Sequence, residues 1–356
     1  MKQNSNFNLS IHGLRGLAAI LVVFFHVHGM GAKNNALWTS IESIRSFAPF
    51  CVCIFFCISG FLIAQTLEKH NSLRIFAKNR LVRIYPVFLV LHLIMFAIGP
   101  AKGYDWMGTL KYGSLNYFQA FFANLLFLPG IFDLPIAQKN AWSLSYEALF
   151  YILAGLVWKT STTLRGVAKN LGLIVLAAII AMAIYTWINA VFFLIGVGCY
   201  LIHSNYERQE LELVRSSTKS TVFSMKILAF PPLPSTYRLG LPALVIAAIG
   251  YAYHPLIAIP FLSIFFVEVV QEDLFSAKIL RLRAIQFLGT ISYSLYLIHP
   301  FVLDLVRSIA VKVAEGNPLL GNLTLIIVGP IVSILVAWFS YELIERKLTK
   351  IILAKV

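Results

Sequence analysis

Long apolar stretches recur along the whole chain, separated by short segments that hold most of the charged residues. A membrane-spanning helix needs about 20 mostly apolar residues, because the hydrocarbon core of a bilayer is about 30 Å thick. We therefore predict an all-α protein, a polytopic transmembrane helical bundle of about ten spanning helices. The predicted spans cover residues 11–29, 47–67, 83–99, 143–158, 170–187, 188–203, 239–253, 255–271, 284–310 and 319–341.

One further apolar segment, from Leu115 to Phe132, is expected not to cross the membrane. A full crossing there would place the basic segment after Trp158 on the outer side. The Pro129-Gly130 pair also favours a turn, and irregular backbone at membrane depth is tolerated only inside protein or beside a water-filled cavity. We predict a re-entrant or interfacial helix over this segment.

Lysine and arginine residues collect between the apolar runs, within residues 69–83, 159–169, 208–238, 278–283 and 346–355. Cytoplasmic loops of membrane proteins carry such an excess of positive charge. Ten crossings place all five basic segments and both termini on the cytoplasmic side. We expect one domain over residues 1–356, with a cytoplasmic loop over 204–238 and no extracytoplasmic domain.

Composition supports lipid as the main solvent of this chain. Hydrophobic residues make up 59% of the 356 positions and charged residues 12%, a balance unlike that of a soluble domain. The net charge of +14 is explained by orientation in the membrane rather than by nucleic-acid binding. Four cysteines lie in apolar segments without histidines at metal-ligand spacing, so we interpret them as small core residues and expect no metal.

The first span carries two ionisable residues, Arg15 and His26, which are eleven positions apart. At about 100° and 1.5 Å per residue they share a face of the helix and lie about 16 Å apart along its axis. Ionisable groups within membrane spans normally face a cavity or a partner. His26 can accept a proton from an attacking hydroxyl, because imidazole titrates near neutrality. The alternative is that Arg15 reaches the cytoplasmic interface and His26 only marks the outer end.

Arg80 and Arg83 are three residues apart, so they are neighbours on a helix surface at the expected cytoplasmic end of the third span. Guanidinium groups suit phosphate oxygens, which makes the pair a candidate binding site for a phosphorylated cofactor. The alternative is an ordinary group of positive charges on the cytoplasmic side.

The segment Trp142-Ser143-Leu144-Ser145-Tyr146-Glu147 opens a span at its expected outer end. Glu147 could orient an imidazole or bind sugar hydroxyls, and the Trp142 ring is of the kind on which sugars stack. The alternative is an interfacial aromatic residue beside a carboxylate at a helix N-terminus, where negative charge is favourable.

Three other ionisable residues are given structural interpretations. His299 lies deep in an apolar run, where a polar packing role is expected. Glu342 and Glu345 lie beside Arg346 and Lys347 and are interpreted as charge balance at the last interface.

Five ordered motifs together resemble the acyltransferase-3 family of membrane acyltransferases, over nearly the whole chain. They are Leu14-Arg15-Gly16-Leu17-Ala18-Ala19 leading to His26, Phe55-Phe56-Cys57-Ile58-Ser59-Gly60-Phe61-Leu62-Ile63, Arg80-x-x-Arg83-Ile84-Tyr85-Pro86, Trp142-Ser143-Leu144 to Glu147, and Ser292-Tyr293-Ser294-Leu295-Tyr296-Leu297-Ile298-His299.

The resemblance implies an enzyme of the bacterial inner membrane. It implies transfer of an acetyl or similar acyl group from cytoplasmic acetyl-CoA, the acyl donor, to a sugar hydroxyl of a surface glycan, for which we expect lipopolysaccharide O-antigen. The residues expected to act are His26, Arg15 and Glu147 in catalysis, Arg80 and Arg83 in binding coenzyme A, and Trp142 and Ser143 in binding the acceptor. The alternatives are a proton-coupled transporter and an exopolysaccharide O-acetyltransferase of the same family.

Overall fold

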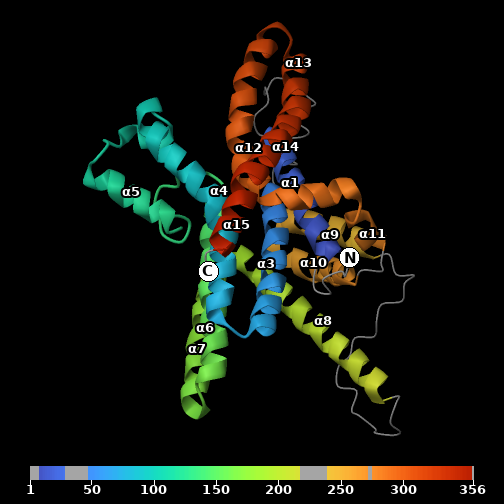
Figure 1. Cartoon of the computed structure of the whole chain (residues 1–356). Helices are drawn as coiled ribbons and strands as arrows, with labels where there is room; N and C mark the ends of the chain where they lie inside the picture. The colour runs from blue at the N-terminus through green and yellow to red at the C-terminus, as the bar shows by residue number, and fades with distance from the viewer. Residues whose placement is uncertain (1–7, 29–46, 217–238, 272–274, 355–356) are drawn as a thin grey trace.

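The structure is a computed structural model that describes residues 8–28, 47–216, 239–271 and 275–354. These residues form helices joined by turns, without a β-strand, which confirms the predicted all-α membrane bundle (Figure 1). Seven helical segments in the described ranges are long and apolar enough to cross a membrane, and two further apolar helices are shorter. The total of about ten spanning helices therefore stays a prediction.

The spanning segments contain α1 (Leu9–His28), α3 (Ala48–His70), α4 (Leu73–Lys102), α6 (Ala141–Thr163), α7 (Gly166–Thr186), η3 with α8 (Ile188–Ala190 and Val191–Ser216), and a last run made of α13 (Pro318–Leu323), η4 (Thr324–Val328), α14 (Gly329–Ser340), η5 (Tyr341–Glu345) and α15 (Arg346–Ala354). The shorter apolar helices are α9 (Gly240–Tyr253) and α10 (Pro255–Val270). The remaining elements are η2 (Asp105–Thr109), α5 (Leu115–Leu125), α11 (Phe275–Leu280) and α12 (Arg283–Gly316).

Two helix pairs meet at glycines that bring their backbones into contact. Helices α1 and α12 run parallel, and a Cβ atom at Gly16 would overlap the backbone nitrogen of Gly289. Helices α3 and α8 meet at Gly60 and Gly196, where an added Cβ would overlap a carbonyl oxygen of the partner helix. Small residues permit such close approach in membrane bundles, where packing drives helix association. These contacts fix the helices that carry Arg15 and Ser59.

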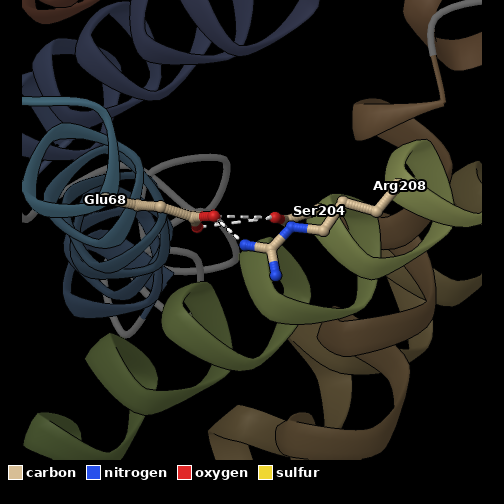
Figure 2. Close-up of polar contacts among 3 residues, drawn as sticks. All are labelled: Glu68, Ser204 and Arg208. Carbon is tan, nitrogen blue, oxygen red and sulfur yellow. Dashed lines mark hydrogen bonds and ion pairs between the residues drawn. The ribbon is translucent and has the colours of Figure 1, made fainter. Parts of the chain in front are cut away.

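Helix α8 continues through Ser216, so the segment predicted as a cytoplasmic loop from residue 204 starts as helix, while residues 217–238 lie outside the described ranges. Figure 2 shows how this extension is attached to α3: Glu68 accepts hydrogen bonds from Ser204 and Arg208. Such exposed ion pairs contribute about 0–1 kcal/mol. The contact therefore sets the position of the helix end more than it stabilises the fold.

Two other segments depart from regular spans. Helix α4 starts at Leu73, ten positions before the predicted span, because its first turns are polar but still helical; Ser72 caps them by accepting from the backbone nitrogen of Ile75. Helix α5 has 11 residues, about 16 Å of helix and too short to span a bilayer. It ends in a turn where Phe127 and Gly130 have positive φ angles.

Candidate active site

A small, partly open pocket of about 40 Å³ lies where α1, α3, α4, α6 and α12 meet. It contains Arg15, Arg83, Ser143 and Glu147, four of the seven residues predicted from the sequence. The complete lining is Arg15, Val52, Phe55, Phe56, Ser59, Arg83, Ser143, Leu144, Glu147, Ser292, Tyr293 and Tyr296. Each of the five motifs therefore contributes to one site.

Glu147 is the acceptor at the centre of the hydrogen bonds around this pocket. Its Oε1 atom accepts from Ser59 Oγ of α3 at 2.6 Å and from the hydroxyl of Tyr151, one helical turn further along α6. Residues four apart lie on the same helix face, which is why Tyr151 reaches the carboxylate. The two donors fix the carboxylate from two helices.

The guanidiniums of Arg15 and Arg83 provide positive charge in the same pocket. Both interact electrostatically with Glu147 and with Glu345 of η5. The Nε atom of Arg15 is buried and has no hydrogen-bond partner within the described ranges. Buried polar groups are rarely left unpaired in folded proteins, and this one belongs to a residue that lines the pocket, where it can donate to a bound group.

His26 lies outside the pocket and is connected to the pocket residue Tyr296 through His299. Its Nδ1 atom is 2.8 Å from the carbonyl oxygen of Val22, so Nδ1 carries the proton and Nε2 is the basic nitrogen of the neutral ring. The ring makes an edge contact with His299, with centroids 4.9 Å apart. His299 follows the pocket residue Tyr296 by three positions, about 4.5 Å of helix.

A set of buried hydrogen bonds connects this histidine pair to the pocket. Asn140 Nδ2 donates to the carbonyl oxygen of Tyr296 at 2.6 Å and lies 3.5 Å from Nε2 of His299. The Tyr296 hydroxyl and Ser143 Oγ are 2.7 Å apart. Arg15 and His26 lie eleven residues apart on one continuous helix, α1, which is consistent with the expected axial separation of about 16 Å, and the contacts of His299 and Tyr296 lie between His26 and the pocket.

Arg80 lies behind the pocket rather than in it. Its Nη2 atom donates to Thr66 Oγ1 at 2.9 Å and to the carbonyl oxygen of Leu62 at 3.3 Å. Its guanidinium also lies over the rings of Phe76 and Tyr151, 5.6 and 5.4 Å from their centroids. The Arg80 guanidinium thus makes its contacts inside the bundle, and it holds the ring of Tyr151, whose hydroxyl donates to Glu147.

Trp142 also lies apart from the pocket lining. Its ring packs edge-on against Trp187 and Tyr146, with centroids 6.0 Å away in both cases. Its neighbour Ser143 lines the pocket, because consecutive helical residues point about 100° apart. Trp142 thus lies outside the pocket that Ser143 lines, and the binding of an acceptor by either residue stays a prediction.

Several residues of the site were not singled out from the sequence. Ser59 and Tyr296 were inside recognised motifs without a role, and Tyr151 could have been found from its spacing to Glu147. Asn140 comes just before a helix, where its position suggests only a cap. No sequence signal shows the contact between Glu345 and Ser294, because it depends on an irregular turn described below.

Comparison with known proteins places these motifs in a family. The model of the acyltransferase-3 family, described as an acyltransferase domain, matches residues 8–342. The chain is 23% identical to the peptidoglycan O-acetyltransferase OatA of Listeria monocytogenes, over 96% of this chain and 56% of that protein. It is 24% identical to the putative peptidoglycan O-acetyltransferase YrhL of Bacillus subtilis, over 97% of this chain and 55% of that protein.

A third relative matches over a shorter region: the acyltransferase MdmB of Streptomyces mycarofaciens is 28% identical over 40% of this chain and 37% of that protein. No solved structure matches the chain. The chain spans little more than half the length of the two peptidoglycan relatives. The family match covers all the residues that line the pocket, and this multi-pass membrane protein therefore belongs to the acyltransferase-3 family.

Proposed function

We propose that this protein is a membrane O-acetyltransferase that moves an acetyl group from acetyl-CoA to a hydroxyl of a cell-envelope glycan. The observation that carries the proposal is the pocket itself, in which two guanidiniums and a hydrogen-bonded carboxylate surround about 40 Å³ inside a membrane bundle. Charges at such depth are costly and usually mark functional sites.

The pocket volume favours a short acyl group. A water molecule needs about 10–15 Å³ of such space, so the pocket accommodates about three non-hydrogen atoms. An acetyl group has that size, whereas a fatty acyl chain is larger than this volume. The apolar side chains of Val52, Phe55 and Leu144 suit its methyl group, and the charged side chains suit its oxygen.

The chemistry follows from the two kinds of charged residue. An acetyl-CoA thioester would supply the acyl group. Arg15 and Arg83 stabilise the negative charge that develops on the carbonyl oxygen, because fixed positive groups are most effective where water is excluded. The acceptor oxygen forms the new C–O bond as the C–S bond breaks, its proton passes to Nε2 of His26, and coenzyme A leaves as the thiolate.

Glu147 is assigned to orientation of the site. It offsets the charge of the guanidiniums and fixes Ser59 and Tyr151 by hydrogen bonds. The positions of Arg80 and Arg83 inside the bundle argue against the phosphate-binding role that we predicted for them. We propose instead that Arg83 acts at the carbonyl and that Arg80 positions Tyr151.

The acceptor is proposed from the relatives. Two of them are named as peptidoglycan O-acetyltransferases and match nearly the whole of this chain, one of them as a putative enzyme. Peptidoglycan is therefore the first acceptor to test, ahead of the lipopolysaccharide O-antigen that the motif resemblance led us to expect. Donor entry from the cytoplasm remains part of the proposal, as the basic segments suggest.

The test is acetyl transfer by the purified protein in lipid nanodiscs. Radiolabelled acetyl-CoA is offered with peptidoglycan fragments, with O-antigen or without an acceptor, and labelled glycan is counted. We expect label in one glycan, a loss of at least about 100-fold in His26→Ala, as for removal of a general base, and no loss in the exposed control His70→Ala. An inactive wild-type protein, or a His26→Ala variant as active as the control, would refute the proposal.

A further inference from the structure

The last membrane segment contains an irregular turn that places one carboxylate toward the active site. Residues Tyr341–Glu345 form a π-helical turn directly after α14. Turns of this kind are rare and occur frequently at functional sites. In a regular α-helix Glu342 and Glu345, three residues apart, would lie within about 60° of each other on one face.

The structure gives these two glutamates different partners. Glu342 Oε2 accepts from Arg346 Nη1 at 2.6 Å, and both side chains of this pair are exposed. Glu345 Oε2 accepts instead from Ser294 Oγ of α12 at 2.7 Å. The interpretation as charge balance at the interface is therefore supported for Glu342 and is wrong for Glu345.

Glu345 also acts on the two guanidiniums of the pocket. It interacts electrostatically with Arg15 and with Arg83, although it does not line the pocket itself. The two arginines repel each other, and Glu147 is the one carboxylate among the lining residues. Glu345 supplies a second negative charge near the two guanidiniums, on a carboxylate bound to Ser294, which is the neighbour of the pocket residue Tyr293.

Helix α12 holds both sides of this arrangement through adjacent residues. The hydroxyl of Tyr293 donates to the carbonyl oxygen of Ile84, next to Arg83 on α4, while Ser294 donates to Glu345. Both tyrosine and serine belong to the motif that ends at His299. The contacts link α4, α12 and the π-helical turn at the back of the pocket.

From this geometry we propose that Glu345 is a positioning residue, which holds Arg15 and Arg83 in place for the acyl carbonyl by neutralising their mutual repulsion. The proposal rests on the function proposed above. The proposal states that the negative charge of residue 345, more than the volume of its side chain, determines how well Arg15 and Arg83 are positioned. The oxygen that accepts from Ser294 is retained in Gln, whereas the negative charge is lost.

The kinetic test compares Glu345→Gln with Glu342→Gln, the same substitution three residues earlier. We expect Glu345→Gln to lower kcat for acetyl transfer by about 10- to 100-fold, the scale of a small misplacement of acting groups. KM for acetyl-CoA should change less than about threefold, and Glu345→Asp should restore part of kcat. Glu342→Gln should stay within about twofold of wild type, since it loses only an exposed pair.

Melting temperatures test the interaction between Glu345 and Arg83 without an activity measurement. Glu345→Gln and Arg83→Gln each leave a charge uncompensated, so the double variant should melt at a higher temperature than the two single losses predict. Additive losses of melting temperature would overturn the proposal, as would an unchanged kcat in Glu345→Gln or an equal loss of kcat in Glu342→Gln.

If Glu345→Gln fails to fold, Ser294→Ala removes the orienting hydrogen bond alone, and an unchanged kcat in that variant refutes the positioning role. A wild-type protein without transferase activity refutes the proposed function but leaves the melting result to decide on the contact.

Discussion

The size of the proposed active-site pocket predicts which acyl groups the protein accepts. About 40 Å³ holds the three non-hydrogen atoms of an acetyl group. Propionyl adds one methylene, and forcing an extra methylene into a packed site costs about 1–3 kcal/mol. Since about 1.36 kcal/mol is a factor of ten, we expect kcat/KM for propionyl-CoA to be about 5- to 150-fold below that for acetyl-CoA.

Leu144→Ala should relax this selectivity. Leu144 is buried in α6 and lines the pocket, so its truncation removes three carbon atoms from the wall. Propionyl-CoA should then be used about as well as acetyl-CoA. Leu153→Ala is the matched control, because Leu153 is buried in the same helix but lines other cavities. Both truncations cost about 2–5 kcal/mol of stability, so stability does not distinguish them.

The assay measures initial rates with acetyl-, propionyl- and butyryl-CoA for wild type and both variants in nanodiscs. Selectivity is the ratio of kcat/KM values, so a smaller fraction of folded protein cancels. The reasoning fails if wild type uses propionyl-CoA as well as acetyl-CoA. It also fails if Leu153→Ala changes the ratio as much as Leu144→Ala.

Two further predictions follow from single contacts. Tyr151→Phe removes the hydroxyl that donates to Glu147, and hydrogen bonds to charged groups contribute about 1.5–3 kcal/mol. We therefore expect this variant to lower kcat in the transfer assay by about 10- to 100-fold. The control Tyr146→Phe, on the same helix, should leave kcat nearly unchanged. Gly196→Ala places a methyl group against the carbonyl oxygen of Cys57 and should destabilise the protein by about 1–3 kcal/mol. The measurement is the melting temperature, which should fall. An unchanged melting temperature would contradict the close contact of α3 with α8.

Much of the site could be predicted from the sequence because of one physical constraint. Charged residues in apolar spans are too costly to face lipid, so Arg15 and Glu147 had to point into the bundle. The helical repeat then placed Ser143 on the same face as Glu147, four residues away. The identity of the pocket residues was therefore accessible from spacing and from the motifs.

Other features depend on information that spacing does not contain. Trp142 was expected to face the acceptor, but which face of α6 meets which neighbour is decided by packing against Trp187. The inward direction of Glu345 depends on a π-helical turn, whereas a regular helical repeat groups it with Glu342. The start of α4 was predicted too late, because hydropathy falls at charged residues while helix propensity does not.

The glycine contacts between helices have a mechanical consequence. Where backbones touch, as at Gly16 with Gly289 and at Gly60 with Gly196, one helix cannot slide or rotate against the other without steric overlap. Within each pair, α1 with α12 and α3 with α8, the two helices are thus held in one register. Helices α4 and α6, which carry Arg83 and Glu147, make no such glycine contact with α1, α3, α8 or α12 among the described residues, and are joined to them by side-chain hydrogen bonds from Tyr293 to Ile84 and from Ser59 to Glu147. Such bonds can break and form again as a helix moves, so a movement that admits a substrate falls more easily to α4 and α6 than within either glycine-packed pair.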